Sequence, residues 1–128
     1  MAKGHGRAPS QRQLRVGEEL RHALATVMER HELRDPRLAA VDVTITEVSV
    51  SPDLKNARAY VAVLGKTASE EVVAALDHAA PYLRRRIGEL VQLRFLPALR
   101  FAADPSFDYA DHIDGLLRQV ELDRGDGA

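Results

Sequence analysis

Apolar residues recur at helical spacing near the start of the chain, and they predict its first element. From Ser10 a stripe of apolar positions indicates an amphipathic helix that ends near Glu32. Ser10 is a suitable N-cap, and Asp35-Pro36 marks a turn because the residue before proline avoids the helical region. The stripe consists of Val16, Leu20, Ala23, Leu24, Val27 and Met28.

Two segments rich in β-branched residues follow the turn. Residues 41–50 alternate in polarity and predict a strand, and the apolar phase changes between Ile45 and Val48, which indicates a β-bulge or a local twist. The residues 51–53 supply a turn with proline at its second position, and residues 57–64 form the returning strand. Together these segments predict a β-hairpin.

Helical spacing returns after the hairpin, interrupted by a proline. Gly65 ends the strand, and Thr67 and Glu70 have the spacing of a capping box, which predicts a helix start. The apolar stripe stops at Pro81 and a new stripe begins at Leu83, so we expect a helix, a kink and a second helix. The kink falls on three residues, Ala79, Ala80 and Pro81.

The next segment alternates between aromatic or aliphatic residues and arginines. Phe95, Leu99 and Phe101 alternate with Arg94 and Arg100, which predicts a third strand with the phenylalanines in the core. The two arginines then lie on the opposite face of the sheet. There they either extend a basic surface or form ion pairs with neighbouring strands.

The last element and the element order predict the fold class. An apolar stripe from Tyr109 to Val120 predicts a helix, for which Asp104 or Ser106 provides the cap. The order is helix, strand, strand, helix, kinked helix, strand, helix. It fits an α+β domain in which helices cover one face of a three-stranded sheet and the other face is open.

Composition limits the domain organisation and the chemistry. The 128 residues suit one domain, and 45% hydrophobic with 29% charged residues excludes disorder throughout. We expect a flexible basic tail at residues 1–9, a domain over residues 10–122 and a flexible tail at residues 123–128. The absence of cysteine excludes disulfides, thiolate metal sites and cysteine nucleophiles. No apolar run is long enough to span a membrane and no signal peptide is evident, so a cytoplasmic location is expected.

The net charge of −1 conceals a segregation of signs along the chain. The formal charge is +3 over residues 1–34, −3 over residues 35–80, +4 over residues 81–101 and −5 over residues 102–128. Such segregation produces a local field that attracts a polyanion even when the total charge is near zero. Nucleic acid is therefore a candidate partner.

Seven segments, in their order and spacing, carry a resemblance to a known family. They are Arg15-Val16, Asp35-Pro36-Arg37, the hairpin from Val48 to Val61, Leu83-Arg84, Leu93-Arg94-Phe95, Pro97 to Phe101, and Asp104-Pro105-Ser106. The chain resembles the bacterial ribosome-binding factor A family over about residues 10–120. The resemblance implies a type II KH-like fold. It also implies a non-catalytic assembly factor, without cofactor, that binds the free small (30S) ribosomal subunit and assists late maturation of 16S rRNA.

The resemblance also implies that the kink stands where ordinary KH domains have an RNA-binding loop. Ordinary KH domains hold single-stranded RNA with a Gly-x-x-Gly loop, whereas this family has a kink that is usually Ala-x-Gly. The aligned residues here are Ala79, Ala80 and Pro81. Proline breaks the helix by removing a donor, but it does not give RNA the open backbone that glycine offers.

Arginines at the start of the third helix are the first candidates for phosphate binding. Arg84, Arg85 and Arg86 combine guanidinium forks with a helix N-terminus, and both bind phosphate. The alternative is a solvated face paired with Glu89 or with the acidic last helix. Further RNA-binding candidates lie along the first helix, its preceding tail and the third strand: Lys3, Arg7, Arg12, Arg15 and Arg94. For the tail and first helix, the alternative is a plain solvated segment.

No pattern indicates a catalytic or metal site. Carboxylates near the last helix lack the glycine and the terminal glutamate of a calcium loop, so an acidic helix start is the preferred interpretation of Asp104, Asp108, Asp111 and Asp114. His78 and His112 are separated and have no serine or cysteine nucleophile arranged with them.

The expected protein is therefore a monomer that binds 16S rRNA in the small subunit, with ribosomal proteins and a release GTPase as further partners. One rival is a KH-fold protein-interaction module that contacts ribosomal proteins or an assembly GTPase. A second rival is a small hydrolase or nuclease, for which we find no combination of base, nucleophile and metal ligands.

Overall fold

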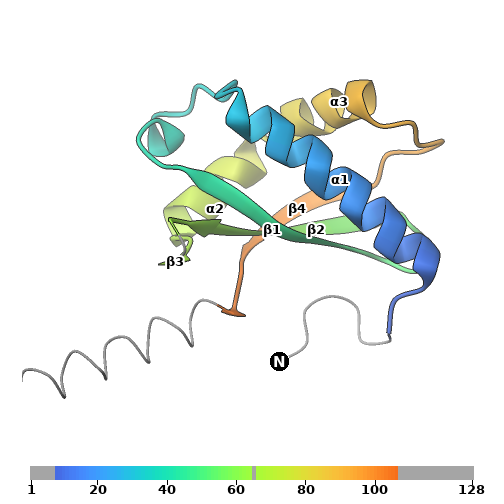
Figure 1. Cartoon of the computed structure of the whole chain (residues 1–128). Helices are drawn as coiled ribbons and strands as arrows, with labels where there is room; N and C mark the ends of the chain where they lie inside the picture. Colours follow the sequence, from blue (N-terminus) through green and yellow to red (C-terminus); the bar gives the residue numbers. More distant parts are fainter. Residues whose placement is uncertain (1–7, 65, 107–128) are drawn as a thin grey trace, which may run out of the picture.

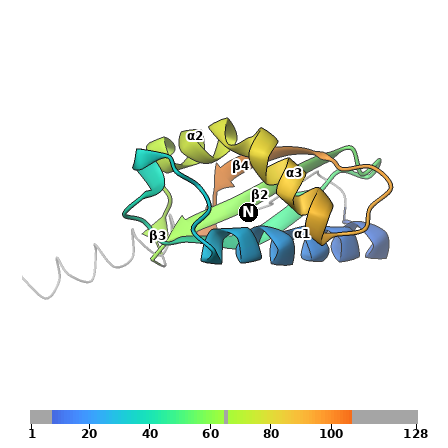
Figure 2. The ribbon, with the colours of Figure 1, turned by 90° about the horizontal axis from the view of Figure 1, so that it is seen from above.

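Three helices lie on one face of a small sheet in the computed structural model, which describes residues 8–64 and 66–106 (Figures 1 and 2). The α+β class and the element order expected of a type II KH-like domain are confirmed, and the last expected helix lies outside the described residues. The elements are α1 (Gln11–Glu29), the 3-10 helix η1 (Pro36–Leu38), β1 (Val43–Val50), β2 (Asn56–Val63), β3 (Lys66–Thr67), α2 (Glu70–His78), α3 (Ala80–Leu90) and β4 (Ala98–Ala103).

Strand β2 is the centre of the sheet. It pairs with β1 in antiparallel and with β4 in parallel, so that Ala59 has Val48 on one side and Phe101 on the other. The two-residue strand β3, which the sequence pattern does not indicate, pairs in antiparallel with Ala62 and Val63 at the end of β2. In the described part of the chain, no helix has the length and apolar composition needed to cross a membrane.

The core lies between the helices and the sheet. The side chains of Leu20, Leu24 and Leu76 are fully buried, and so is that of Leu83 in α3. They pack against alternate residues of the strands, among them Val61. The apolar stripes that predicted the helices are therefore the faces that the helices bury.

Thr67 does not cap the second helix, so the predicted capping box is wrong. Thr67 pairs with Ala62 as part of β3, and its backbone is used in the sheet. Ser69 is the N-cap instead, and its hydroxyl accepts a hydrogen bond from the Val72 amide at 3.2 Å. Helix α2 therefore begins after Ser69.

The predicted bulge in β1 is confirmed. The register shifts between Ile45 and Glu47, which leaves Thr46 as the extra residue. The Thr46 hydroxyl donates to Oδ2 of Asp104 at 2.6 Å and lies 3.2 Å from the carbonyl oxygen of Tyr60. The bulge thus connects three segments, since Asp104 follows β4 and is buried.

The third predicted strand begins later than its sequence pattern indicated. Strand β4 starts at Ala98, and Phe95 lies in the preceding loop as a residue that is 77% exposed. The expectation that Phe95 belongs to the core is wrong, whereas Leu99 and Phe101 are buried as predicted. Pro97 has no amide hydrogen, so the strand pairing cannot extend back through it.

The face of the sheet away from the helices is open at one end. Arg58 and Arg100 are register partners on this face, and both are exposed. Tyr60 and Ala62 on the same face are buried. Arg94, which was expected beside Arg100, lies instead in the loop before β4.

Candidate nucleic-acid interface

A groove of about 880 Å³ lies where three segments meet at one end of the molecule. These segments are the first turns of α1, the β1–β2 turn and the loop between α3 and β4, which Figure 2 shows together at the N-terminal end of α1. Four cations line it, and we call it the cationic groove after Arg12, Arg15, Lys55 and Arg94. Two carboxylates, from Glu19 and Asp53, also line it, so cations are in excess.

The start of α1 is fixed by hydrogen bonds. Ser10 and Gln13 form a capping box, in which the Gln13 amide donates to the Ser10 hydroxyl at 3.1 Å and the Ser10 amide donates to Oε1 of Gln13 at 2.9 Å. The side-chain amide of Gln13 donates to the carbonyl oxygen of Val50 at 2.8 Å, which fastens the helix start to the end of β1. Arg12 and Arg15 are exposed beside these contacts.

The β1–β2 turn holds Lys55 in a defined position. Ser51 donates its hydroxyl to Oδ1 of Asp53 at 2.7 Å, and the Lys55 amide donates to the same oxygen at 3.0 Å. These two hydrogen bonds, the one from Ser51 foremost, hold the pKa of Asp53 below its ordinary value. Leu54 adopts a φ of 62°, which lets the chain reverse just before Lys55.

Arg84 organises the loop that carries Arg94. Its Nε donates to the carbonyl oxygen of Pro97 at 3.1 Å, and its terminal nitrogen donates to that of Leu96 at 2.8 Å. The Ala98 amide donates to the carbonyl oxygen of Lys55 at 2.8 Å and joins this loop to the β1–β2 turn. The groove walls are therefore linked to one another.

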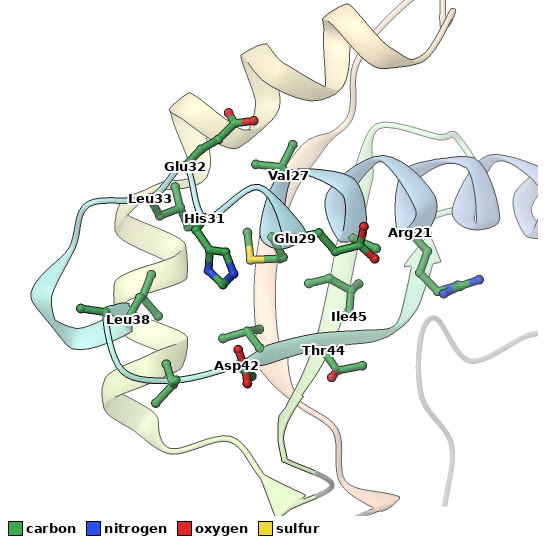
Figure 3. A pocket seen from close by; sticks show the side chains of 15 residues that line it. Arg21, Val27, Glu29, His31, Glu32, Leu33, Leu38, Asp42, Thr44 and Ile45 are labelled. Carbon is green, nitrogen blue, oxygen red and sulfur yellow. The ribbon is translucent and has the colours of Figure 1, made fainter.

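Arg86 has protein partners of its own. It donates to Glu32 at 2.8 and 3.1 Å and to Glu89 at 2.8 Å, and the Tyr82 hydroxyl also donates to Glu32. The hydrogen bonds from Arg86, and then that from Tyr82, lower the pKa of Glu32 to about 2. These contacts attach the segment after α1 to α3, and Figure 3 shows Glu32 pointing toward that helix.

The kink next to these residues is observed where the proline predicts it. Ala79 is both the C-cap of α2 and the N-cap of α3, and Pro81 occupies the first turn of α3, where a missing amide hydrogen costs nothing. The Leu83 amide donates to the carbonyl oxygen of Ala79 at 3.0 Å and starts the new helix.

A second cavity of about 600 Å³ lies between the end of α1, the following loop and the start of β1 (Figure 3). Its lining contains the carboxylates of Glu29, Glu32 and Asp42 against the single guanidinium of Arg21 and the imidazole of His31. An acidic lining repels phosphate. Of these two hollows, the cationic groove is the better match for a polyanion.

The chain also matches proteins of one family. The family model for ribosome-binding factor A matches residues 12–117. The chain belongs to the ribosome-binding factor A family. The ribosome-binding factor A of Rhodospirillum rubrum is 50% identical over 124 residues, which span 97% of this chain and 76% of that protein. That of Agrobacterium fabrum is 46% identical over 125 residues, which span 97% of this chain and 91% of that protein.

Solved structures of ribosome-binding factor A have a similar fold. The crystal structure of the Thermus thermophilus factor superposes with a TM-score of 0.57 at 30% identity, covering 70% of this chain and 93% of that one. The solution structure from Thermotoga maritima gives 0.58 at 28% identity, covering 76% and 91%. A homology model of the Thermus thermophilus factor, fitted into a cryo-EM map of its complex with the 30S subunit, gives 0.56 at 29% identity, covering 70% and 91%.

Arg84, Arg85 and Arg86, which the sequence predicts to act as one phosphate-binding group, have different surroundings in the structure. Arg84 and Arg86 donate to protein oxygens, and the pairing of Arg86 with Glu89 is the alternative that the sequence left open. Arg85 is exposed, with its guanidinium carbon 5.4 Å from the centre of the Tyr82 ring. Arg94, far in sequence from Arg12 and Arg15, joins these two arginines in the cationic groove. Lys3 and Arg7 lie outside the described residues.

Sequence reasoning did not select Lys55 or Phe95 as functional residues. Lys55 follows a turn motif, which predicts a reversal of the chain but not the neighbours of its side chain. Pro97, two residues after Phe95, is the one local signal that the strand starts later.

Asp104 and His78 are the candidates for a metal or catalytic role that lie in the described region. Asp104 accepts hydrogen bonds from the Thr46 hydroxyl and from the Ser106 amide at 2.9 Å. Among the described residues, no group of three or more His, Cys, Asp or Glu side chains could hold a metal ion. His78 is the exposed last residue of α2. The remaining candidates fall outside the described residues: Asp108, Asp111, His112 and Asp114.

Proposed function

We propose that the protein binds the small ribosomal subunit by placing phosphates of 16S rRNA in the cationic groove. The observation that carries the proposal is the convergence of Arg12, Arg15, Lys55 and Arg94 from three separate segments. Within the described part of the chain, neither Arg12 nor Arg15 forms an ion pair. Guanidinium groups that face solvent without a carboxylate partner remain available to phosphate oxygens.

The family relatives support the choice of partner. A Thermus thermophilus relative has been fitted into a map of its complex with the 30S subunit, and it shares the fold of this chain. We extend that partner to this protein. Arg85 is a further phosphate contact at the exposed side of α3, and Lys3 and Arg7, which lie outside the described residues, are further candidates for contact with phosphate.

Arg84 acts within this site as a positioning residue. The break at Ala79, Ala80 and Pro81 starts α3 in a new direction, and Arg84 on its first turns reaches the carbonyl oxygens of Leu96 and Pro97. Its two hydrogen bonds fix the loop that presents Arg94. The predicted direct contact between Arg84 and RNA would compete with this role.

The activity we propose is binding without catalysis. Occupancy of the groove stabilises one arrangement of 16S rRNA against others, because a ligand shifts an equilibrium by its differential affinity for the two states. This assists late maturation of the RNA in the cytoplasm, with the protein acting as a monomer and without a cofactor. We expect ribosomal proteins and a release GTPase as further partners in this role.

Co-sedimentation with isolated 30S subunits over a salt series tests the proposal. Each phosphate contact that is lost flattens the slope of log affinity against log salt by about 0.7 to 0.9. The variant Arg12→Ala with Arg15→Ala should therefore bind more weakly, with a slope reduced by about 1.4 to 1.8. Arg30→Ala with Arg34→Ala is the matched control, because it removes two exposed arginines that follow the C-terminal end of α1, away from the groove.

Each result decides between the candidate functions. A reduced slope for the groove variant, and an unchanged slope for the control, supports RNA binding in the groove. Binding with equal slopes for all three proteins overturns the groove site and favours the protein-interaction module. Absence of binding by the wild type overturns the proposed function as a whole.

A further inference from the structure

The loop before β4 exposes an aromatic ring inside the cationic groove. Phe95 lines the groove and is 77% exposed, whereas Phe101 and Tyr60 are buried at 5% exposure. Phenylalanine is a residue that folding normally removes from water, because its side chain is entirely apolar. The exposure of Phe95 is therefore unfavourable unless the surrounding contacts hold it there.

Anchoring of the loop on both sides of the ring accounts for the position of Phe95. Leu93 and Leu96 pack against the core, and the hydrogen bonds from Arg84 hold the carbonyl groups of Leu96 and Pro97. The backbone between these anchors turns Phe95 outward. The ring is therefore exposed because contacts on both sides of it fix the loop in this conformation.

The neighbours of the ring are those of a base-binding surface. The guanidinium carbon of Arg94 lies 5.6 Å from the centre of the Phe95 ring, which places a cation over one face of this exposed residue. Arg12, Arg15 and Lys55 line the same groove. Proteins that bind single-stranded RNA combine these two features, cations for the backbone and an exposed aromatic ring on which a base stacks.

We propose that Phe95 is a stacking platform for one unpaired nucleobase of RNA, with Arg94 against the ring and the groove cations on the flanking phosphates. The inference rests on the proposed function and specifies its substrate class as single-stranded rather than duplex RNA. A paired base in a duplex is stacked on its neighbours and cannot lie on the ring. The groove therefore selects unpaired nucleotides by stacking and holds them by charge.

The chain contains no tryptophan, which makes Phe95→Trp a direct reporter of stacking. Titration of this variant with a single-stranded oligoribonucleotide of about ten nucleotides should quench its fluorescence, and a duplex of the same length should not. Polyglutamate of similar length is the test for an acidic peptide as the occupant. Tight binding of polyglutamate together with absence of quenching by RNA would overturn the proposal.

Substitutions that remove the ring separate stacking from charge. Phe95→Ala and Phe95→Leu should weaken binding of the single-stranded oligonucleotide by about 5- to 160-fold, and Phe95→Trp should retain it. The slope against salt should be unchanged in all three, because stacking releases no counterions. Since Phe95 is exposed, these variants should fold, and circular dichroism checks that they do.

The outcomes distinguish failure of the inference from failure of the proposed function. If Phe95→Ala binds both the oligonucleotide and the 30S subunit as the wild type does, while the Arg12 and Arg15 variant does not, the stacking proposal fails and the groove remains an RNA site. If the wild type binds neither, both proposals fail. If Phe95→Ala binds the 30S subunit with lower affinity at every salt concentration but with the same slope of log affinity against log salt, both proposals are supported.

Discussion

Helix α1 can lie on the sheet at its present distance only because residue 17 has no side chain. A Cβ atom built on Gly17 would be 2.4 Å from the carbonyl oxygen of Val48, whereas ordinary contact begins at 3.4 Å. The shortfall is about 1.0 Å. The obstacle is backbone of β1, which is held by pairing with β2 and cannot turn aside as a flexible side chain would.

Replacement of Gly17 by Ala should therefore destabilise the protein although alanine favours helices. The helical preference of alanine over glycine contributes about 1 kcal/mol of stability. Overpacking costs about 1–3 kcal/mol, and an immovable obstacle places this case at the upper end. We expect a net loss of about 1–2 kcal/mol in the free energy of unfolding.

Urea unfolding followed by far-UV circular dichroism measures this change. With a slope of about 2 kcal/mol per molar urea, the midpoint should fall by about 0.5–1 M. Gly88→Ala is the matched control, because Gly88 lies in α3 and a Cβ there would meet only Cδ1 of Leu96 at 2.9 Å. That atom is the movable end of a side chain, so Gly88→Ala should be neutral or up to about 1 kcal/mol more stable.

The two glycine variants together can refute the reasoning. A Gly17→Ala midpoint equal to or above that of the wild type would show that α1 moves off the sheet without cost. Equal destabilisation by both substitutions would show that the Val48 oxygen is not the cause.

Two further substitutions test contacts between distant segments. The hydrogen bonds from Arg86 lower the pKa of Glu32 to about 2. The contribution of the Glu32 carboxylate to stability is therefore present above its ordinary pKa of 4.5 and is lost as the pH falls toward 2. In Glu32→Gln, the free energy of unfolding should fall less steeply between these pH values. Urea midpoints between about pH 2 and 5 check this, and parallel curves for variant and wild type would contradict it. Thr46→Val should cost about 1–3 kcal/mol, because Asp104 loses a buried hydrogen bond, while exposed Thr44→Val should change the midpoint little; equal effects of the two would refute a role for the bulge hydroxyl.

Several features of the fold follow from local sequence alone. The helical stripe after Ser10 predicts α1, and the hydroxyl of Ser10 caps it as expected. The phase change after Ile45 predicts the bulge, and Pro81 predicts the break between α2 and α3. In each case the cause acts within a few residues, through side-chain periodicity, a capping hydroxyl or a missing amide hydrogen.

Errors arose where contacts between distant segments override local preference. Thr67 and Glu70 have capping-box spacing, but pairing with β2 takes up the backbone of Thr67. Phe95 continues an alternating pattern, but Pro97 and the hydrogen bonds from Arg84 start the strand later and expose the ring. Local sequence patterns contain no information about which distant residues will become partners after folding.

The order of residues is enough to predict that positive charge is segregated, that the domain is α+β and that α3 begins at the proline kink. Which cations can share a ligand depends instead on the folded arrangement. It assigned Arg84 to loop carbonyl groups and Arg86 to Glu32 and Glu89, and it gathered Arg12 and Arg94 into one groove. The physical reason is that charge and periodicity belong to the chain, whereas the partner of a guanidinium group depends on the acceptors that folding brings within about 3 Å of it.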